Sequence, residues 1–211
     1  ETRIAEGSTV MGKAMFVSSS RTIAFDFYKE VIKLRPEWAE VLVSDGSQEL
    51  SEVEKKEIKP MERIKMVMTR GKDDAQDLYD VLGTSEYRKM LDGQFKNAKS
   101  NFKIAIVVDM WLTGFDVPFL DTIYIDKPIK KHNLIQTISR VNRKFEGKDK
   151  GLVVDYFGIK SAMNQALAMY SKTDATNFED VQLSITEVRN HLDLLGKLFH
   201  IHLVLVACDL P

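Results

Sequence analysis

The 211-residue chain is long enough for one large domain, or for a domain with a helical appendage, and its 44% hydrophobic and 29% charged residues are typical of globular proteins. The net charge of −1 gives no overall attraction to nucleic acid, so any such binding must come from local patches. The single cysteine excludes an internal disulfide and a cysteine-based zinc site, and the four scattered histidines suggest no metal cluster.

Residues 1–12 contain few apolar side chains and are predicted to form a lead-in. Because the chain begins at Glu1, we expect it to be a fragment of a longer protein. The run 7–14 nearly matches the phosphate-binding pattern G-x-x-x-x-G-K-[ST]. A working loop of this kind follows a strand, opens a helix and carries a hydroxyl residue for Mg²⁺. Here Ala14 replaces the hydroxyl residue and a strand follows, so we reject this run as a nucleotide site.

Residues 13–18 are predicted to form a strand, and three serines, Ser18 to Ser20, lie where the next helix begins. Apolar residues at helical spacing carry that helix to Arg35, directly before Pro36. Serines at a helix N-terminus cap it through their side chains or bind phosphate through backbone N–H groups. Capping is favoured here, but both uses can hold at once.

The next stretch is expected to be less regular. Residues 40–43 are predicted to form a short strand. Residues 45–62 carry six acids, three lysines and almost no core residues, so we expect a solvated, charged insertion or a mobile loop. Residues 64–69 are predicted to form another strand, which ends in a basic turn at 69–72.

Two helices are predicted after this turn. Asp73 or Asp74 is expected to cap the first, which ends near Leu82. The second covers about 84–98, and its inward side chains are Tyr87, Met90, Leu91 and Phe95. The strand that follows, 103–108, is a continuous apolar run, which indicates burial on both faces, as in a parallel sheet.

Three strands of the second half end in an acid: 103–108 at Asp109, 122–125 at Asp126, and 152–154 at Asp155. A helix over 132–143 is predicted before the last strand. It lies in the one strongly basic stretch, 127–150, with eight Lys/Arg and two acids. Since helical residues advance about 100° each, one amide and two guanidiniums project together from Gln136, Arg140 and Arg143. The opposite, apolar side carries Leu134, Ile138 and Val141.

Alternating strands and helices predict an α/β fold with a mainly parallel sheet. Ligands of such folds bind at the carboxyl ends of the strands. We therefore expect one edge to carry Asp109, Gly114, Asp116, Asp126, Arg140 and Arg143. A Mg²⁺-dependent phosphatase of the D-x-D type is an alternative, but Trp111 stands where its second acid should be. A phospho-receiver would need an early acid pair, and a Rossmann-type domain would need G-x-G-x-x-G, which is absent from the sequence.

Further helices are predicted over 159–171 and 179–197. The apolar tail 198–208 is expected to pack against this domain or to drive self-association. No apolar run reaches the roughly 20 residues that span a membrane, and no signal peptide is seen, so a cytoplasmic protein is expected.

Three runs carry a family resemblance: D-M-W-L-T-G-F-D-V-P, then H-N-L-I-Q-T-I-S-R-V-N-R, then G-L-V-V-D-Y. Together they resemble the second RecA-like domain of superfamily 2 helicases. More narrowly, they are similar to the motor of the restriction (R) subunit of type I restriction–modification enzymes. The resemblance is best over 101–160 and extends loosely back to residue 13. It therefore implies a RecA-like domain over 13–160 and the start of a helical region over 161–211.

The resemblance implies functional roles for three groups of residues. Motif V, which couples the nucleotide to the nucleic acid, would comprise Thr113, Gly114 and Asp116. Motif VI would comprise Gln136, Arg140 and Arg143, with the two arginines as candidates for an arginine finger; which of them reaches the γ-phosphate stays open. The DNA backbone would be contacted by Ser18, Ser19, Arg21, Thr69, Arg70 and Lys72.

The resemblance also implies the cofactors and partners. ATP and Mg²⁺ would be bound mainly by the first RecA-like domain of the parent chain, which this sequence lacks. Double-stranded DNA would be the track, and the specificity and methylation subunits would complete the restriction complex. The fragment alone is expected to be inactive. The alternatives are a non-catalytic nucleic-acid- or protein-binding α/β module and half of another superfamily 2 helicase; the intact motif VI favours the motor.

Overall fold

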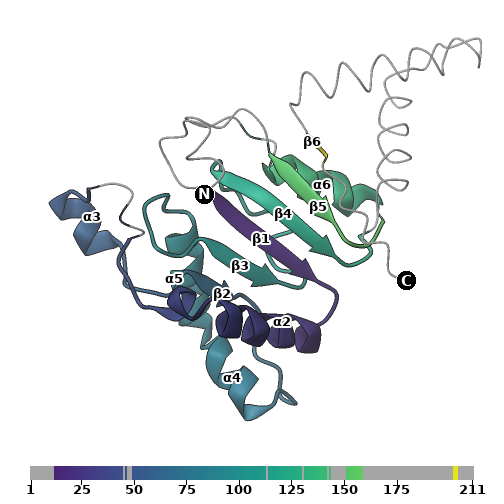
Figure 1. Cartoon of the computed structure of the whole chain (residues 1–211), viewed down its shortest axis with the longest axis horizontal. Helices are drawn as coiled ribbons and strands as arrows, with labels where there is room; N and C mark the ends of the chain where they lie inside the picture. The colour runs from purple at the N-terminus through teal and green to yellow at the C-terminus, as the bar shows by residue number, and fades with distance from the viewer. Residues whose placement is uncertain are drawn as a thin grey trace, which may run out of the picture.

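The computed structural model describes residues 12–44, 46, 49–112, 114–129, 131–141, 143, 151–158 and 202–203. Six parallel strands form one sheet in the order β2-β3-β1-β4-β5-β6 (Figure 1). The strands are β1 (Lys13–Ser18), β2 (Ile64–Met66), β3 (Ile104–Val107), β4 (Leu120–Asp126), β5 (Leu152–Asp155) and β6 (His202–Leu203). The predicted α/β class with a parallel sheet is confirmed, and the arrangement agrees with a RecA-like fold.

The helices lie on both faces of the sheet. They are α2 (Arg21–Leu34), the short 3₁₀ helix η1 (Pro36–Ala39), α3 (Glu52–Glu57), α4 (Gln76–Leu82), α5 (Ser85–Phe95) and α6 (Lys131–Val141). The chain moves from β1 to β2 in one direction across the sheet, and from β2 to β3 and from β4 to β5 in the other. Right-handed crossovers therefore put α2 on one face and both α5 and α6 on the opposite face.

Several predicted segments lie outside the described residues. They include the lead-in up to residue 11, the helices over 159–171 and 179–197, and the tail 198–208 except for β6. The boundary at residue 160 between the RecA-like domain and a helical region therefore stays a prediction. Strand β6 pairs with β5 at the edge of the sheet, in parallel.

Lys13 starts β1, as predicted, and its side chain is fully buried. Its Nζ donates to the carbonyl oxygen of Gln94 at 3.0 Å and lies 4.9 Å from the ring centre of Phe95. Gly12 is required just before it, because a Cβ there would lie 2.5 Å from the Cβ of Asp121. The lysine therefore belongs to the core, and a strand follows the glycine where a phosphate-binding loop would need a helix.

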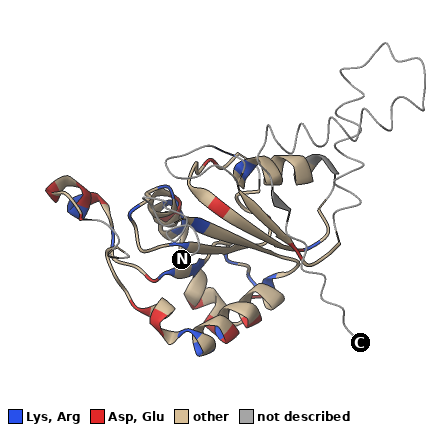
Figure 2. Cartoon of the chain, turned by 45° about the horizontal axis from the view of Figure 1, so that its top comes forward, with Lys and Arg blue, Asp and Glu red and all other residues tan. Residues whose placement is uncertain are grey.

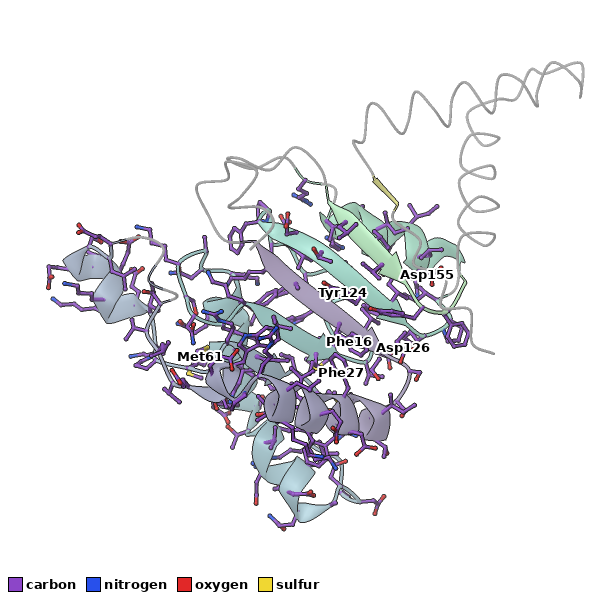
Figure 3. All side chains as sticks on the ribbon, viewed as in Figure 1. Phe16, Phe27, Met61, Tyr124, Asp126 and Asp155 are labelled. Atoms are coloured by element: carbon purple, nitrogen blue, oxygen red, sulfur yellow. The ribbon has the colours of Figure 1, made fainter. Side chains whose placement is uncertain are left out.

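Helix α2 begins as predicted, with a serine cap. The Ser20 hydroxyl accepts a hydrogen bond from the backbone N–H of Ile23 at 3.2 Å, which satisfies one of the free donors of the first turn. Phe27 of this helix stacks on Phe16 of β1 with ring centres 3.9 Å apart (Figure 3). This contact fixes α2 on its face of the sheet.

The predicted strand over 40–43 is wrong. After Pro36 the chain forms η1, and it then makes only isolated antiparallel bridges in this region, one of which joins Leu42 to Met61. Val41 and Leu42 stay largely exposed. The apolar run has a strand-like composition, but β2 already forms the edge of the sheet, so no sheet neighbour buries it.

The charged segment 45–62 is only partly as expected. Helix α3 forms within it, and Figure 2 shows this charged helix projecting away from the sheet. A capping box starts the helix: Glu54 N–H donates to the Ser51 hydroxyl, and Ser51 N–H donates to the Glu54 carboxylate. The end of the segment is not solvated, because Ile58 and Met61 are buried.

The carboxyl group of Glu54 should titrate well below the ordinary pKa of a glutamate. Its pKa is lowered from 4.5 to about 2, first by a hydrogen bond from Lys99 and then by the Ser51 N–H. A carboxylate with a lowered folded-state pKa stabilises the fold above its unfolded-state pKa, and this stabilisation is lost as the pH falls from 4.5 towards about 2. Carboxyl NMR titration of the chain checks this. Lys99→Ala should raise the midpoint, and an unchanged midpoint in that variant would contradict the assignment.

Asp73 and Asp74 do not cap α4, contrary to expectation. The cap position is Ala75, which has no capping side chain. Asp74 instead accepts a hydrogen bond from the Gly71 N–H at 2.6 Å and so closes the preceding turn. Helix α5 agrees better with the prediction: Thr84 caps it, and its inward residues Leu91 and Phe95 are buried, with Tyr87 and Met90 packed against them.

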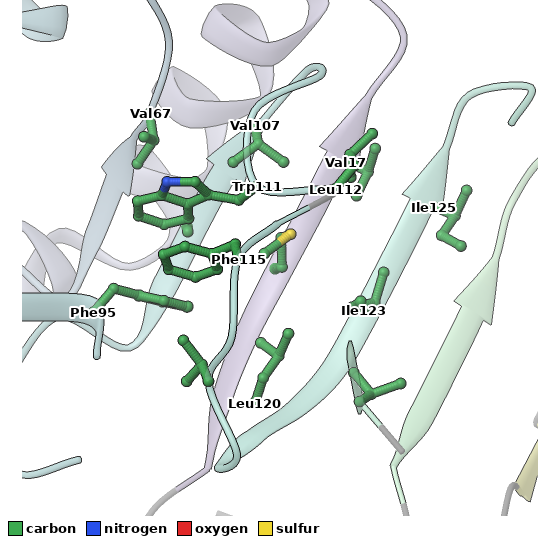
Figure 4. Packing of buried hydrophobic residues seen from close by; sticks show 14 of the residues in the cluster. Val17, Val67, Phe95, Val107, Trp111, Leu112, Phe115, Leu120, Ile123 and Ile125 are labelled. Carbon is green, nitrogen blue, oxygen red and sulfur yellow. The ribbon is translucent and has the colours of Figure 1, made fainter. Parts of the chain in front are cut away.

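The main core lies between the sheet and α5 with α6, and aromatic rings form its centre (Figure 4). Phe95 lies 4.9 Å from Phe102 and 5.2 Å from Trp111, measured between ring centres. Trp111 in turn stacks on Phe115 at 4.1 Å with nearly parallel planes. The loop between β3 and β4 is therefore part of the core rather than a free surface loop.

Candidate functional site

An ion pair joins the two segments that carry the family resemblance. Arg143 Nη1 lies 2.9 Å from Asp116 Oδ2, and the two side chains are 46% and 50% exposed. Asp116 comes from the T-G-F-D run between β3 and β4, and Arg143 follows α6. Thr113 and Asn142, which belong to the same two runs, lie outside the described residues. The structure thus brings together two charged residues that are far apart in sequence.

Helix α6 is amphipathic as predicted, but it is shorter. Its apolar side, Leu134, Ile138 and Val141, is buried against the sheet. The helix ends at Val141, so Arg143 is not on it, and the expectation of a helix over 132–143 is corrected. The carbonyl of Val141 approaches Gly151 closely, since a Cβ on Gly151 would lie only 2.2 Å from that oxygen.

Arg140 occupies the last turn of α6 and is partly exposed. Its Nε is buried and has no hydrogen-bond partner among the described residues. An unsatisfied buried donor costs about 1–3 kcal/mol, and more for a charged group. Gln136 lies one helical turn before Arg140. It is partly buried and interacts with another group of the protein.

Backbone conformation shapes the loop that carries Asp116. Gly114 has φ 70°, and a Cβ there would meet open space, so the positive φ alone accounts for the glycine. Trp111 also has a positive φ, 67°, which is strained for a bulky residue. Its indole is held between Phe95 and Phe115. No residue pattern in the sequence signals the positive φ of Trp111.

The acids at the strand ends form a second, separate group. Lys127 Nζ donates to Asp109 Oδ1 at 2.7 Å and to the carbonyl of Val108 at 3.1 Å. This pair links the carboxyl ends of β3 and β4 across the end of β1. Asp126 and Asp155 end their strands at the same edge (Figure 3).

The expectation that all six candidate residues share the carboxyl edge is wrong. Helix α6 leaves the carboxyl end of β4 and returns the chain to the amino end of β5, so its last turn lies towards the amino edge. Arg140 and Arg143 therefore lie towards the edge opposite Asp109 and Asp126. Asp116 is close to Arg143, in a loop that returns to the start of β4.

The residues predicted to contact DNA divide into two groups. Ser18 is fully buried, and its hydroxyl donates to the Ser20 carbonyl at 3.2 Å, which does not favour a direct contact. Arg21 and Arg70 are engaged within the protein. Arg21 contacts Asp74 and the Thr69 carbonyl, and Arg70 donates to the Tyr79 carbonyl. Exposed side chains remain at Ser19, Thr69 and Lys72. The partners Asp74 and Tyr79 were not predicted.

The described part of the chain holds no group of three His, Cys, Asp or Glu residues that could bind a metal ion. None of its helices is long and apolar enough to cross a membrane.

Comparison with known proteins decides the family. Residues 11–158 match the family described as type I restriction enzyme subunit R domain 3. The chain belongs to the family of type I restriction enzyme R subunits. The type I restriction enzyme HindI endonuclease subunit of Haemophilus influenzae is 36% identical to this R-subunit domain over 195 residues, 90% of the chain. The putative MjaIXP endonuclease subunit of Methanocaldococcus jannaschii is 36% identical over 190 residues.

The R-subunit domain spans only a small part of these relatives. It covers 17% of the HindI subunit and 16% of the MjaIXP subunit. A further relative, the SauCOLORF180P endonuclease subunit of Staphylococcus aureus, is 40% identical over 97 residues, 44% of the chain. The resemblance read from the sequence runs is therefore confirmed at the level of the family.

Proposed function

We propose that this chain is the C-terminal RecA-like half of an ATP-dependent duplex-DNA translocase motor in a type I restriction endonuclease R subunit. The observation that carries the proposal is the Asp116–Arg143 ion pair at 2.9 Å, with the unpaired Nε of Arg140 one helical turn away in sequence. Two motif segments meet there, and they offer guanidinium groups at one place. Planar guanidiniums suit phosphate groups better than ammonium groups do.

The described residues fit a phosphate but not a metal ion. Arg140 and Arg143 each carry a guanidinium that suits phosphate oxygens, and Asp116 orients the guanidinium of Arg143. ATP, when bound, supplies the γ-phosphate on which negative charge develops during transfer to water. Mg²⁺ needs oxygen ligands that this part of the chain does not group together. We assign both ligands mainly to the first RecA-like domain of the parent chain.

In this proposal Arg140 is the arginine finger, and the ion pair with Asp116 fixes the orientation of the Arg143 guanidinium. Gln136 precedes them on α6 and completes motif VI. Thr113 and Gly114 belong to motif V with Asp116, and they couple the nucleotide to the DNA track. The partners are double-stranded DNA, the first RecA-like domain, and the specificity and methylation subunits of a cytoplasmic restriction complex. The relatives' names as endonuclease subunits support the complex.

The chain alone should not hydrolyse ATP. Lys13, which would be the catalytic lysine of the apparent phosphate-binding loop, is fully buried in β1 and donates to the Gln94 carbonyl. Phosphate release by the purified chain, with and without duplex DNA, should therefore equal that of buffer, while the full-length parent should show DNA-dependent turnover. Robust turnover by the isolated chain would contradict the assignment to the half of the motor that lacks the nucleotide-binding loop.

A further inference from the structure

The loop 69–74, which contains the basic turn 69–72, is tied to the first residue of α2. Arg21 Nε donates to Asp74 Oδ1 at 3.1 Å, and its Nη2 is ion-paired with Asp74 Oδ2. Its Nη1 donates to the Thr69 carbonyl at 2.7 Å. Asp74 Oδ2 also accepts from the Gly71 N–H at 2.6 Å. One guanidinium and one carboxylate thus hold the start, the middle and the end of the loop, with the two-pronged geometry of a strong arginine–carboxylate pair.

This clasp between Arg21 and Asp74 is well shielded. The Asp74 side chain is only 8% exposed, against 33% for Arg21. Burial alone would raise the pKa of Asp74, but the Gly71 N–H and the Arg21 guanidinium lower it below its ordinary value. A Cβ on Gly71 would lie 3.0 Å from Asp74 Oδ1, so glycine allows this close approach. The carboxylate stays charged at neutral pH and keeps the turn closed.

One cation of the turn, Lys72, takes no part in the clasp. Arg70 folds back onto α4: its Nε donates to the Tyr79 carbonyl at 2.7 Å, and its guanidinium carbon lies 4.0 Å from the centre of the Tyr79 ring. Lys72 is exposed and makes no ion pair within the described part of the chain. Among the cations Arg21, Arg70 and Lys72, Lys72 is therefore the one with no ion pair or hydrogen bond within the described residues.

The position of the clasp in the sheet gives it a spacing role. Arg21 follows β1 and the serine loop 18–20, whereas the basic turn follows β2. Strand β3 lies between β1 and β2 in the sheet. The clasp therefore spans the end of β3 and fixes the distance between the serine loop and the basic turn, which are the two loops assigned to the DNA backbone.

We propose that Arg21 and Asp74 are positioning residues for binding the phosphodiester backbone of duplex DNA. They hold the basic turn so that Lys72 contacts a phosphate, and Arg21 does not contact DNA itself. This inference rests on the proposed function and makes it more specific. It also reassigns Arg21, because each of its three guanidinium nitrogens already has a partner in the clasp or at the Thr69 carbonyl.

The test measures binding of a labelled duplex of arbitrary sequence to the full-length parent subunit at several salt concentrations. Lys72→Ala should reduce the slope of log affinity against log salt by about 0.9, the value for one phosphate contact on duplex DNA. Asp74→Ala should weaken binding and reduce the slope by a similar amount. Simple electrostatics predicts the opposite sign for Asp74→Ala, because it removes a negative charge near a polyanion. In the Lys72→Ala background, Asp74→Ala should cause no further loss.

Matched variants separate positioning from charge and from folding. Asp26→Ala removes an acid from the exposed face of α2, where Asp26 pairs with Lys29 at 2.9 Å, and should not weaken binding. Asp74→Asn keeps an oxygen for the Gly71 N–H but loses the charge that holds Arg21, so its loss should be intermediate. Melting temperatures of all variants show whether each is folded at the temperature of the binding measurement.

Two results would overturn the inference. One is tighter binding by Asp74→Ala, or binding equal to that of the wild type. The other is a further slope reduction of about 0.9 when Arg21→Ala is added to Lys72→Ala, which would make Arg21 a direct phosphate contact. A different result would contradict the proposed function itself. If the wild-type parent lacks DNA-stimulated ATP turnover, the proposed function is wrong, and the inference that rests on it is wrong as well.

Discussion

Replacing Arg140 by alanine in the full-length parent should lower DNA-stimulated ATP turnover by about 10³–10⁵-fold, the usual worth of an arginine finger. That loss corresponds to roughly 4–7 kcal/mol of activation free energy. The expectation rests on the guanidinium of Arg140, whose Nε has no hydrogen-bond partner within the described residues. A positioned guanidinium stabilises the negative charge that develops in the transition state. Arg140→Lys should also fail, because an ammonium cannot copy the planar guanidinium. ATP binding should weaken much less.

Arg143→Ala should also abolish most of the turnover, while both variants keep their stability. Arg143 is 46% exposed, and its ion pair with Asp116 is at the surface. Removing an exposed pair costs about 0.2–1 kcal/mol, so the melting temperature should hardly change. Gln136→Ala should be milder, since no full charge is lost. The measurement is DNA-stimulated ATPase activity beside the melting temperature of each variant.

A matched control is available on the same domain. Arg35 is an exposed arginine with a weak ion pair, 3.9 Å from Glu37, and Arg35→Ala should leave turnover unchanged. If Arg140→Ala and Arg143→Ala melt normally and keep turnover within a few-fold of this control, both arginines are ordinary surface residues. The alternative of a non-catalytic α/β binding module would then be favoured.

Phe95→Ala should destabilise the chain by about 3–5 kcal/mol, the range for truncating a large buried aromatic residue. Phe95 is fully buried, and its ring meets Phe102, Trp111 and the Lys13 ammonium. The truncation would therefore leave a cavity and weaken the support of the loop that carries Asp116. Urea denaturation of the chain measures the loss as a lower midpoint at an unchanged slope.

The control for this change is Leu34→Ala at the end of α2. Leu34 is 77% exposed, so its truncation should change stability by no more than about 0.5 kcal/mol. Equal urea midpoints for Phe95→Ala and the wild type would show that the aromatic centre of the core contributes little to the free energy of unfolding.

Local sequence patterns predicted the helices and strands well where interactions between near neighbours in the sequence determine the structure. The strand at 13–18 has the predicted ends, and Ser20 caps α2, because capping and the apolar composition of a strand are local features of the sequence. Residues 40–43 have the composition of a strand, but they find no neighbour in the sheet. Whether a strand-like run joins a sheet depends on strands elsewhere in the chain, which its own residues do not encode.

The candidate site was harder to predict, because its geometry depends on tertiary contacts. Nothing in the run Q-T-I-S-R-V-N-R stops a helix, yet α6 ends at Val141, beside Gly151. The pairing of Arg143 with Asp116 and of Arg21 with Asp74 joins residues from different elements. The sequence suggested the residue types of the motifs, but it could not show which edge of the sheet each would occupy.

The burial of Trp111 makes the loop before Asp116 optically observable. The chain contains two tryptophans, Trp38 and Trp111. Trp111 is enclosed by Phe95 and Phe115, and only Leu112, Thr113 and Gly114 separate it from Phe115 in the sequence. A variant with Trp38→Phe would keep a single indole at this position. In the isolated chain, its emission wavelength would report, without any attached label, whether the loop leaves its aromatic packing.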